Sequence, residues 1–314
     1  MSIQIAAAKF LARLIPRKLT FDNYGDCYFF RSIRVARMSS AELVEYQLKS
    51  AEQRYNYEIR NRTLEYIFGP CEELIPLLEN KIILDFGCFM GGTTIAWLEM
   101  YRFKKAYGID TDSIFADGAN LFAKRKGANA EFCAAFGEEL PYDDESFDAI
   151  ISLDVFEHVK DLKRCLAECK RVLKVNGHLL AIFPPYYHPM AHHLKVTRTP
   201  CLHWIFHGEV LRRIQNELIV NKWGAEYEHL LLGDLDGYRS PYLNGITVRN
   251  FRKLIADANW EIVVNKIHGF PYMGETVKRS RIAKLISSIN QKFARFPFLE
   301  EITLDRIAMI LRKK

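Results

Sequence analysis

The hydrophobic and polar positions of this chain follow two kinds of pattern. Short apolar runs bounded by turn residues predict buried strands, and apolar residues three or four positions apart predict amphipathic helices. Strands are expected at residues 82–84, 106–110, 178–183, 260–264 and 302–311, with another beginning at Phe147. Helices are expected at residues 41–68, 165–174 and 280–295. This order of elements predicts an α/β protein. One further strand between residues 110 and 147 would make the strand at Phe147 the fourth and the sheet seven-stranded.

The same pattern divides the chain into parts. Residues 1–80 are expected to form an N-terminal helical cap, and residues 81–184 together with 245–314 are expected to form the sheet core. Between residues 185 and 244 the core pattern stops, and aromatic residues and histidines accumulate. This insertion follows the fifth strand, near the carboxyl ends where α/β proteins bind ligands. It is therefore expected to be a substrate lid.

A glycine-rich turn after the first strand is the most informative stretch. The run 82–94 reads IILDFGCFMGGTT, a buried strand followed by a turn and a helix start. Such a turn presents backbone N–H groups to a ligand. Its glycines, Gly87, Gly91 and Gly92, lack the G-x-G-x-x-G spacing of a dinucleotide site. Asp85 at the strand end suits a positively charged ligand, and S-adenosylmethionine (SAM) carries an ammonium and a sulfonium.

This run resembles motif I of the class I SAM-dependent methyltransferases, which reads hydrophobic-L-D-x-G-C-G-x-G. It departs from the motif at Phe89 and Met90, where glycine and a small residue are usual. Residues 138–159 resemble small-molecule methyltransferases, including those of quinone biosynthesis. The motifs follow the family's order over about residues 80–184. The resemblance implies a Rossmann-like class I methyltransferase sheet that uses SAM.

The resemblance also implies which residues contact SAM. The glycine turn would approach SAM closely, and the acid that ends the second strand would accept hydrogen bonds from the ribose hydroxyls. Where the family commonly has an acid near the adenine, this chain has Phe136. The implied SAM-binding residues are Asp85, Gly87, Cys88, Gly91, Asp110, Thr111, Phe136, Gly137, Asp154 and Val155.

Candidate bases follow the fourth and fifth strands. Methyl transfer from a sulfonium is an in-line displacement that depends on alignment, and a hydroxyl acceptor also benefits from a general base. Histidine suits that role because its ordinary pKa lies near neutrality. The candidate catalytic residues are His158, His188, His192 and His193.

Two further interpretations concern the loop after the fourth strand. Some quinone and small-RNA O-methyltransferases hold Mg²⁺ with an E-x-x-E-H motif and a distant histidine. By that resemblance, Mg²⁺ or Zn²⁺ would be held by Asp154, Glu157 and His158, with His192 or His193 as the fourth ligand. In the other interpretation this loop has no metal. Asp154 and Val155 line SAM through their backbone, and Glu157 and His158 fix the following helix.

The net charge of +6 is unevenly distributed. Residues 1–20 hold four basic residues and no acid, residues 278–314 hold ten basic and three acidic residues, and 30 of the 44 basic and 35 of the 38 acidic residues lie between them. This acidic centre makes a nucleic-acid partner unexpected. The basic ends and the amphipathic run 282–293 predict a peripheral membrane contact; that run would alternatively pack on its own domain or form a homodimer contact.

Seven scattered cysteines without a C-x-x-C pair suit a reducing compartment, so a cytoplasmic protein, peripheral to the membrane at most, is expected.

The expected activity is methyl transfer from SAM to a small-molecule, lipid or glycan acceptor, at oxygen. Two alternatives stay open. One is a nucleotide-binding oxidoreductase, and the other is a SAM-fold protein that has lost catalysis and serves as a binding partner.

Overall fold

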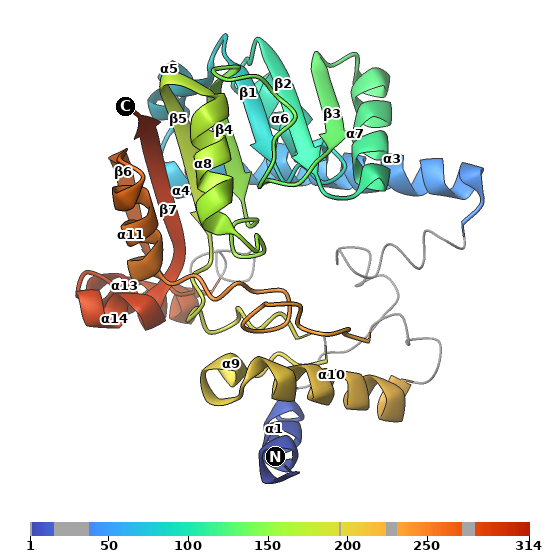
Figure 1. Ribbon diagram of the computed structural model, residues 1–314, viewed down its shortest axis with the longest axis vertical. Helices are drawn as coiled ribbons and strands as arrows, with labels where there is room; N and C mark the ends of the chain where they lie inside the picture. Colours follow the sequence, from blue (N-terminus) through green and yellow to red (C-terminus); the bar gives the residue numbers. More distant parts are fainter. Residues whose placement is uncertain (1, 16–37, 195, 224–230, 272–279) are drawn as a thin grey trace. The chain divides into compact units, whose positions relative to one another are not determined.

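Seven strands form one mixed sheet in the computed structural model, which describes residues 2–15, 38–194, 196–223, 231–271 and 280–314. The strand order is β3-β2-β1-β4-β5-β7-β6 (Figure 1). The first five strands pair in parallel, and β7 is antiparallel to β5. The predicted Rossmann-like α/β sheet is confirmed. The strands are β1 Ile82–Phe86, β2 Lys105–Asp110, β3 Ala130–Ala134, β4 Phe147–Leu153, β5 Leu173–Phe183, β6 Trp260–Gly269 and β7 Leu304–Lys313.

Helices cover both faces of the sheet, with α8 in front of it and α3 behind it in Figure 1. No helix in the described ranges is long and apolar enough to cross a membrane. The helices are α1 Ser2–Ala12, α3 Ser40–Asn61, α4 Thr63–Phe68, α5 Cys71–Leu78, α6 Gly92–Met100, α7 Ser113–Lys126, α8 Leu162–Val172, α9 Leu202–Ile205, α10 Gly208–Trp223, α11 Val248–Asp257, α13 Arg281–Phe293 and α14 Pro297–Thr303.

The chain forms two compact units, and their boundaries differ from those expected. The sheet unit comprises residues 39–183, 251–266 and 307–314, and the second unit comprises residues 1–38, 184–250 and 267–306. The first 80 residues are therefore not one cap, and the second unit takes in more than the expected lid. The reason is packing: the apolar face of α1, with Ala8 and Ala12, lies against Ile214 and Leu218 of α10.

Close packing of α6 on α3 organises the sheet unit. Gly92 opens α6 so near to α3 that a Cβ at this position would lie 2.0 Å from the carbonyl oxygen of Ala51. Only glycine allows this approach. The N-terminal end of α3 is fixed by a capping box, in which Ser39 and Glu42 satisfy each other's backbone N–H groups.

The helix expected over residues 41–68 is two helices. Arg62 has a left-handed backbone with φ of 48° and separates α3 from α4. The buried Glu58 carboxylate accepts hydrogen bonds from the N–H of Thr63 at 2.7 Å, from its hydroxyl at 2.6 Å and from Nε1 of Trp97 at 2.8 Å. In a continuous helix the Thr63 N–H would bond a backbone carbonyl, and here the Glu58 carboxylate replaces that carbonyl. The spacing of apolar residues does not predict these bonds.

The strand expected over residues 302–311 begins two residues later. Pro297 stands at the start of α14, where its missing N–H is not needed, and this helix continues to Thr303. β7 then pairs with β5, with Ile307 opposite Phe183. β6, the edge strand beside β7, extends past the expected end at residue 264 and reaches Gly269.

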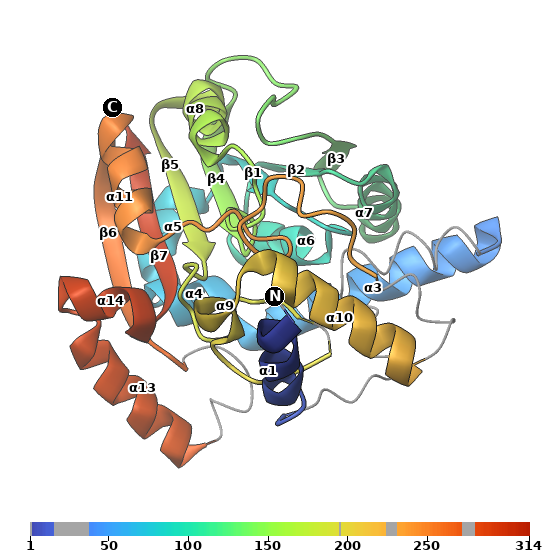
Figure 2. The ribbon, with the colours of Figure 1, turned by 60° about the horizontal axis from the view of Figure 1, so that its bottom comes forward.

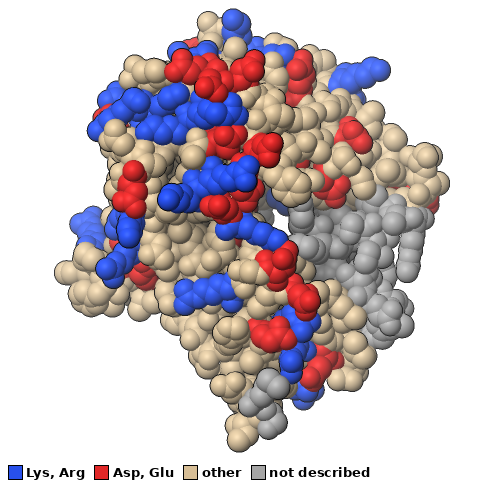
Figure 3. Space-filling model, viewed as in Figure 1, with Lys and Arg blue, Asp and Glu red and all other residues tan. Residues whose placement is uncertain are grey.

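Basic and acidic side chains are interspersed over α8 and the neighbouring part of the sheet unit (Figure 3). Arg171 of α8 donates to the carbonyl oxygens of Leu140 at 3.0 Å and Tyr142 at 2.8 Å. Its guanidinium also bonds the carboxylates of Glu168 and Asp144, each at 2.8 Å. One side chain therefore fastens the segment between β3 and β4 to α8.

Arg171→Ala is expected to lower the free energy of unfolding by about 2 kcal/mol, because two partly buried carbonyls and two carboxylates lose their donor together. Arg164→Ala on the same helix is the matched control. Arg164 is largely exposed and has one contact of 3.5 Å with Glu139, so its loss should cost less than about 0.5 kcal/mol. Urea unfolding followed by circular dichroism measures both, and equal losses would contradict the role given to Arg171.

Candidate active site

The carboxyl ends of four parallel strands meet at one edge of the sheet unit. Phe86 of β1 lies opposite Ile109 of β2 and Ser152 of β4, and Asp110 lies opposite Ala134 of β3. This is the edge at which open α/β sheets bind ligands. The chain leaves the sheet here in segments 87–91, 111–112, 135–137 and 154–158, and all the predicted SAM-binding residues lie in these segments or at the strand ends before them.

The turn after β1 is built on two glycines in the left-handed region, since Gly87 has φ of 89° and Gly91 has φ of 71°. A Cβ at Gly87 would lie 2.2 Å from Cγ2 of Val155, so the turn directly abuts the loop after β4. The N–H groups of Gly87 and Cys88 both donate to the carbonyl of Ile109 at 2.9 Å. The Cys88 side chain is buried, which leaves only its backbone to face a ligand.

The departure from motif I keeps the turn intact. Phe89 has φ of 50°, which explains why glycine is usual at this point. Two contacts offset this strain: its N–H donates to the Asp110 carboxylate at 2.9 Å, and its ring packs edge-on against Phe115 with centroids 4.8 Å apart. Met90 is buried in the same apolar cluster. The larger side chains therefore pack beneath the turn.

Asp85 is enclosed at the end of β1. Its side chain accepts a hydrogen bond from the Thr94 hydroxyl of α6 at 2.5 Å. Burial raises the pKa of Asp85 to about 7, since the loss of hydration outweighs this bond, and nearby Asp110 adds to the rise. At neutral pH the folded protein therefore holds a poorly solvated carboxylate, and a bound cation would lower its free energy. Thr94 is a partner that sequence reasoning missed, although it stands within the quoted motif.

Asp110 ends β2 beside the turn. One carboxylate oxygen accepts from the N–H of Phe89 and the other from the N–H of Asp112, at 2.9 and 3.4 Å. Burial raises the pKa of Asp110 to about 6, although these backbone bonds favour the charged form. The edge thus carries two acids whose charge is disfavoured by burial.

The remaining predicted SAM residues differ in exposure. Thr111 is exposed, and the Phe136 side chain is 66% exposed, so its ring is not part of the core. A Cβ at Gly137 would lie 2.1 Å from Cζ of Phe86, which brings this loop against β1. Asp154 has a left-handed backbone with φ of 57° and donates its N–H to a β5 carbonyl at 2.8 Å.

The segment that contains this edge resembles a known protein family. Residues 84–181 match the family model described as a methyltransferase domain. The match begins in β1 and ends in β5, so it contains the glycine turn, both buried acids and the loop after β4. This segment matches a methyltransferase domain, and we call residues 84–181 the methyltransferase domain.

Curated relatives resemble the methyltransferase domain and its surroundings. The uncharacterized methyltransferase YcgJ of Bacillus subtilis is 32% identical over 101 residues, which cover 32% of this chain and 39% of that protein. Demethylmenaquinone methyltransferase of Thermotoga maritima is 36% identical over 136 residues, which cover 41% and 58%. The chain therefore spans between two fifths and three fifths of these relatives. The crystal structure of YcgJ superposes with a TM-score of 0.41 at 16% identity, covering 77% of this chain and 94% of that one.

His158 is the one predicted catalytic residue within the methyltransferase domain. Its side chain is 38% exposed, and Nε2 lies 3.7 Å from Oε1 of the buried Glu157. The N–H of His158 donates to the carbonyl of Val155 at 2.8 Å, which closes a turn. His158 therefore lies on the loop that carries Asp154 and Val155 of the predicted SAM set.

His192 belongs to the second unit and is a structural residue. Its Nε2 bonds the carbonyl of Thr199 at 2.9 Å, and its Nδ1 accepts from the N–H of Leu194 at 3.0 Å. These bonds require a neutral ring with the proton on Nε2. Because neither ring nitrogen is left for a substrate or an ion, His192 is withdrawn as a catalytic residue and as the fourth metal ligand.

His188 and His193 also belong to the second unit. Nδ1 of His188 accepts from the N–H of Met190 at 3.2 Å, and Nε2 faces the buried Asp305 carboxylate at 3.7 Å. Its ring packs edge-on against Phe270. These neighbours orient His188, whose side chain is only 12% exposed, and its role as a base stays a prediction. His193 is partly exposed with a left-handed backbone and stays a candidate.

The second unit contains a cluster that the sequence did not reveal. The guanidinium of Arg239 lies over the ring of Tyr186, 4.3 Å from its centroid, and near the ring of Tyr187. Nε2 of His203 donates to the carbonyl of Tyr186 at 2.6 Å. Burial, followed by the proximity of His192, lowers the pKa of His203 to about 3. These residues are far apart in the chain, and no motif spacing connects them.

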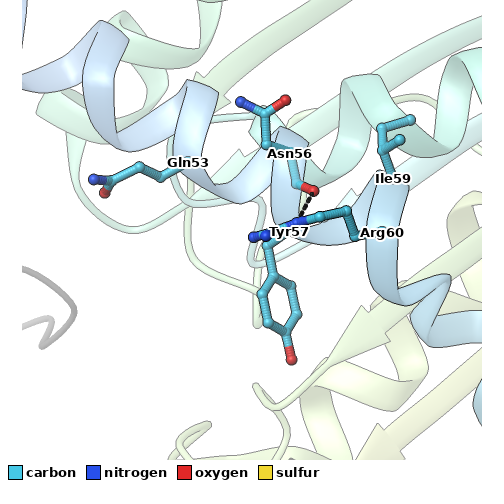
Figure 4. A pocket seen from close by; sticks show the side chains of 5 residues that line it. All are labelled: Gln53, Asn56, Tyr57, Ile59 and Arg60. Carbon is cyan, nitrogen blue, oxygen red and sulfur yellow. Dashed lines mark hydrogen bonds between the residues drawn. The ribbon is translucent and has the colours of Figure 1, made fainter. Parts of the chain in front are cut away.

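A separate surface hollow of about 550 Å³ lies along α3 (Figure 4). Nε of Arg60 donates to the carbonyl oxygen of Asn56 at 3.2 Å. The lining residues are Gln53, Asn56, Tyr57, Ile59 and Arg60. All of them belong to α3, and none belongs to the predicted SAM set.

Asp85→Asn is expected to raise the unfolding temperature at pH 8 and to reduce its dependence on pH. The pKa of Asp85 lies at about 7 in the folded protein and at 3.8 ordinarily, so the folded state holds this proton more tightly. Stability is therefore lost as pH rises through this window. Asparagine keeps an acceptor for Thr94 and removes the buried charge. Thermal unfolding followed by circular dichroism between pH 4 and pH 8 measures the effect.

Asp148→Asn is the control with the opposite sign. Burial raises the pKa of Asp148, but the N–H of Ile82 at 2.8 Å and the Lys174 ammonium at 3.0 Å outweigh it, so the pKa is lowered. Its stabilising contribution is present above the ordinary pKa and is lost as pH falls. This substitution should therefore lower the unfolding temperature at pH 8. If both variants lost stability equally there, the account of Asp85 would be wrong.

Proposed function

We propose that the chain transfers a methyl group from SAM to a hydroxyl of a small-molecule, lipid or glycan acceptor. One observation carries the proposal: within the methyltransferase domain, the buried Asp85 and the partly buried Asp110, both with raised pKa values, flank the glycine turn at the ligand-binding edge of the sheet. Buried carboxylates of this kind favour a cationic ligand. SAM has an ammonium and a sulfonium, whereas a dinucleotide has an anionic pyrophosphate.

Each element of the edge has a proposed part in holding SAM. Asp85, behind the turn, stabilises the ammonium electrostatically, and Asp110 accepts hydrogen bonds from the ribose hydroxyls. The exposed ring of Phe136 covers the adenine, where its apolar face replaces the acid common in the family. The direct contact of Gly87 with Val155 sets the shape of the floor between them. Bound SAM supplies a methyl group activated by the sulfonium.

His158 is the proposed general base. It lies on the loop after β4, is partly exposed, and has the buried Glu157 carboxylate beside it. That carboxylate would stabilise the imidazolium formed when the ring takes the acceptor's proton. His193 is a second candidate for the same proton. The metal interpretation stays a prediction, since the backbone bonds of His192 withdraw only one of its proposed ligands.

Relatives support an acceptor of this class. They include ubiquinone biosynthesis O-methyltransferase of Alkalilimnicola ehrlichii, 34% identical over 104 residues that cover 33% of this chain and 41% of that protein. The seven cysteines without a paired spacing support our placement of the protein in the cytoplasm. An oxidoreductase is disfavoured by the missing G-x-G-x-x-G. A catalytically inactive binding protein would bind SAM and transfer no labelled methyl group in a single turnover.

SAM binding is expected to release protons near pH 6.5. The acids of the free protein titrate at about 7 and about 6, so both are partly protonated there, and a bound cation lowers their pKa values. Titration calorimetry in two buffers of different ionisation enthalpy measures this release, because the observed binding enthalpy changes with the buffer.

Asp110→Asn should reduce the proton release and weaken binding by roughly tenfold or more, as expected for hydrogen bonds of about 1.5–3 kcal/mol to a charged group. S-adenosylhomocysteine, which retains the ammonium, should also release protons. Equal enthalpies in both buffers would remove the electrostatic basis of the proposal. Absence of SAM binding would remove the proposal itself.

His158→Ala is expected to lower turnover by about 10²-fold and to leave SAM affinity nearly unchanged, as for the loss of a general base. His207→Ala, a change at an exposed histidine of the second unit, is the control and should keep full activity. The assay follows labelled methyl from SAM into the small molecules and lipids of a cell extract. Full activity of the His158 variant would show that another group, such as His193, takes the proton, or that the acceptor needs no base.

A further inference from the structure

Helix α13 is attached to its unit through its polar side. The Ser287 hydroxyl donates to the carbonyl of Gly269 at 2.7 Å, and Nδ2 of Asn290 donates to the carbonyl of Phe270 at 2.5 Å. Nε2 of Gln291 bonds the carbonyl of Ile267 at 2.8 Å. The backbones touch as well, since a Cβ at Gly269 would lie 2.2 Å from the N atom of Gln291. These contacts fasten the helix to the end of β6.

The apolar side of α13 consequently faces outward. Its side chains recur at helical spacing and are 44–72% exposed: Ile282, Leu285, Ile286, Ile289 and Phe293. No residue of the helix is buried. A surface helix of a globular protein ordinarily does the opposite and buries its apolar stripe. Figure 2 shows α13 beside α14, with which it is in contact.

The N-terminal end of α14 adds two more exposed apolar side chains. Phe296 and Phe298 are 52% and 77% exposed, and their ring centroids lie 6.3 Å apart. We call the five outward side chains of α13, together with these two rings, the α13 face. A group of large exposed apolar side chains like this one is uncommon on a protein that stays in water and marks a contact with something else.

The charges beside the α13 face have one sign. Four cations lie on the same segment, and residues 281–299 contain no acid: the cations are Arg281, Lys284, Lys292 and Arg295. The next two acids in the sequence are Glu300 and Glu301. Glu300 is buried, and the Glu301 carboxylate accepts from the backbone N–H groups of Val248 and Arg249 at 3.0 and 2.9 Å.

We propose that the α13 face lies in the interfacial region of a membrane that contains anionic lipid. Isoleucine, leucine and phenylalanine enter the boundary between headgroups and acyl chains, while the flanking Lys and Arg contact the anionic headgroups. A second copy of the chain is a poorer occupant. A symmetric pair joins the same patch on both copies, so it would bring eight cations together without an acid between them.

The other basic end of the chain contributes less to this proposal. Lys9 of α1 is paired with Glu217 of α10. Two of the remaining N-terminal cations, Arg17 and Lys18, lie outside the described residues. The membrane contact predicted for both basic ends is therefore assigned to α13 and its connection to α14.

Vesicle co-sedimentation of the full chain tests the assignment. Vesicles of phosphatidylcholine with a minority of phosphatidylglycerol should sediment the protein at low salt, and rising ionic strength should release it because screening weakens the headgroup attraction. Vesicles of phosphatidylcholine alone should bind it at least about tenfold more weakly. Equal recovery with both kinds of vesicle overturns the proposal.

Two double variants separate the two components of the surface. Leu285→Glu with Ile289→Glu should abolish sedimentation with either vesicle, and Lys284→Glu with Lys292→Glu should remove the preference for anionic lipid. Val175→Glu, at an exposed apolar position of the sheet unit, is the matched control and should bind like the unchanged protein. All these side chains are exposed, so circular dichroism and SAM affinity should stay the same.

Analytical ultracentrifugation without lipid distinguishes the alternative occupant. The proposal expects a monomer in both the unchanged chain and the Leu285→Glu, Ile289→Glu variant. A dimer that this variant converts to a monomer would overturn the membrane assignment in favour of self-association. Because SAM affinity and methyl transfer are measured separately, failure of the vesicle experiment leaves the proposed reaction untouched, and failure of the reaction leaves the membrane contact untouched.

Discussion

Close backbone approach around the glycine turn is the constraint on which the site depends. Gly87 lies directly against Val155, and Gly92 lies directly against the backbone of α3, so a side chain at either position would separate the elements that meet there. The turn is also bonded to the carbonyl of Ile109 at the end of β2. The positions of three strand ends and of two helices relative to one another therefore follow from the absence of two Cβ atoms.

Two buried acids follow from the same geometry. When the turn closes over the strand ends, Asp85 and Asp110 are removed from water, and desolvation raises the pKa of each. An apolar residue in the place of Asp85 would be expected to raise the free energy of unfolding. Asp85 therefore lowers the stability of the fold. Sites whose residues oppose stability are frequently functional. This supports a cationic ligand at the edge without reference to any relative.

Helices α8 and α13 show how far an amphipathic pattern can be interpreted. Both have a marked apolar stripe, but α8 buries its stripe with Leu162, Leu166 and Val172, whereas α13 buries no residue. The difference lies in the partner. The apolar side of α8 lies on the sheet unit, and α13 is bonded to the end of β6 by Ser287, Asn290 and Gln291. A periodic pattern states that a face is apolar, and only the structure states what covers it.

The sequence by itself determined the sheet and the edge that carries the candidate site, because strand periodicity, turn glycines and acids at strand ends are local signals. The tertiary structure decided the rest, because it depends on contacts between residues distant in the chain. The Glu58 carboxylate, which Trp97 of α6 also binds, accepts from the N–H of Thr63 where the spacing predicts the helix to continue. Helix α1 packs on α10 and not within the expected cap. The backbone partners of His192 convert a candidate base into a structural residue. The sequence gives the chemical type of each side chain. Whether the polar atoms of that side chain can bind a ligand depends on the groups that folding brings next to them.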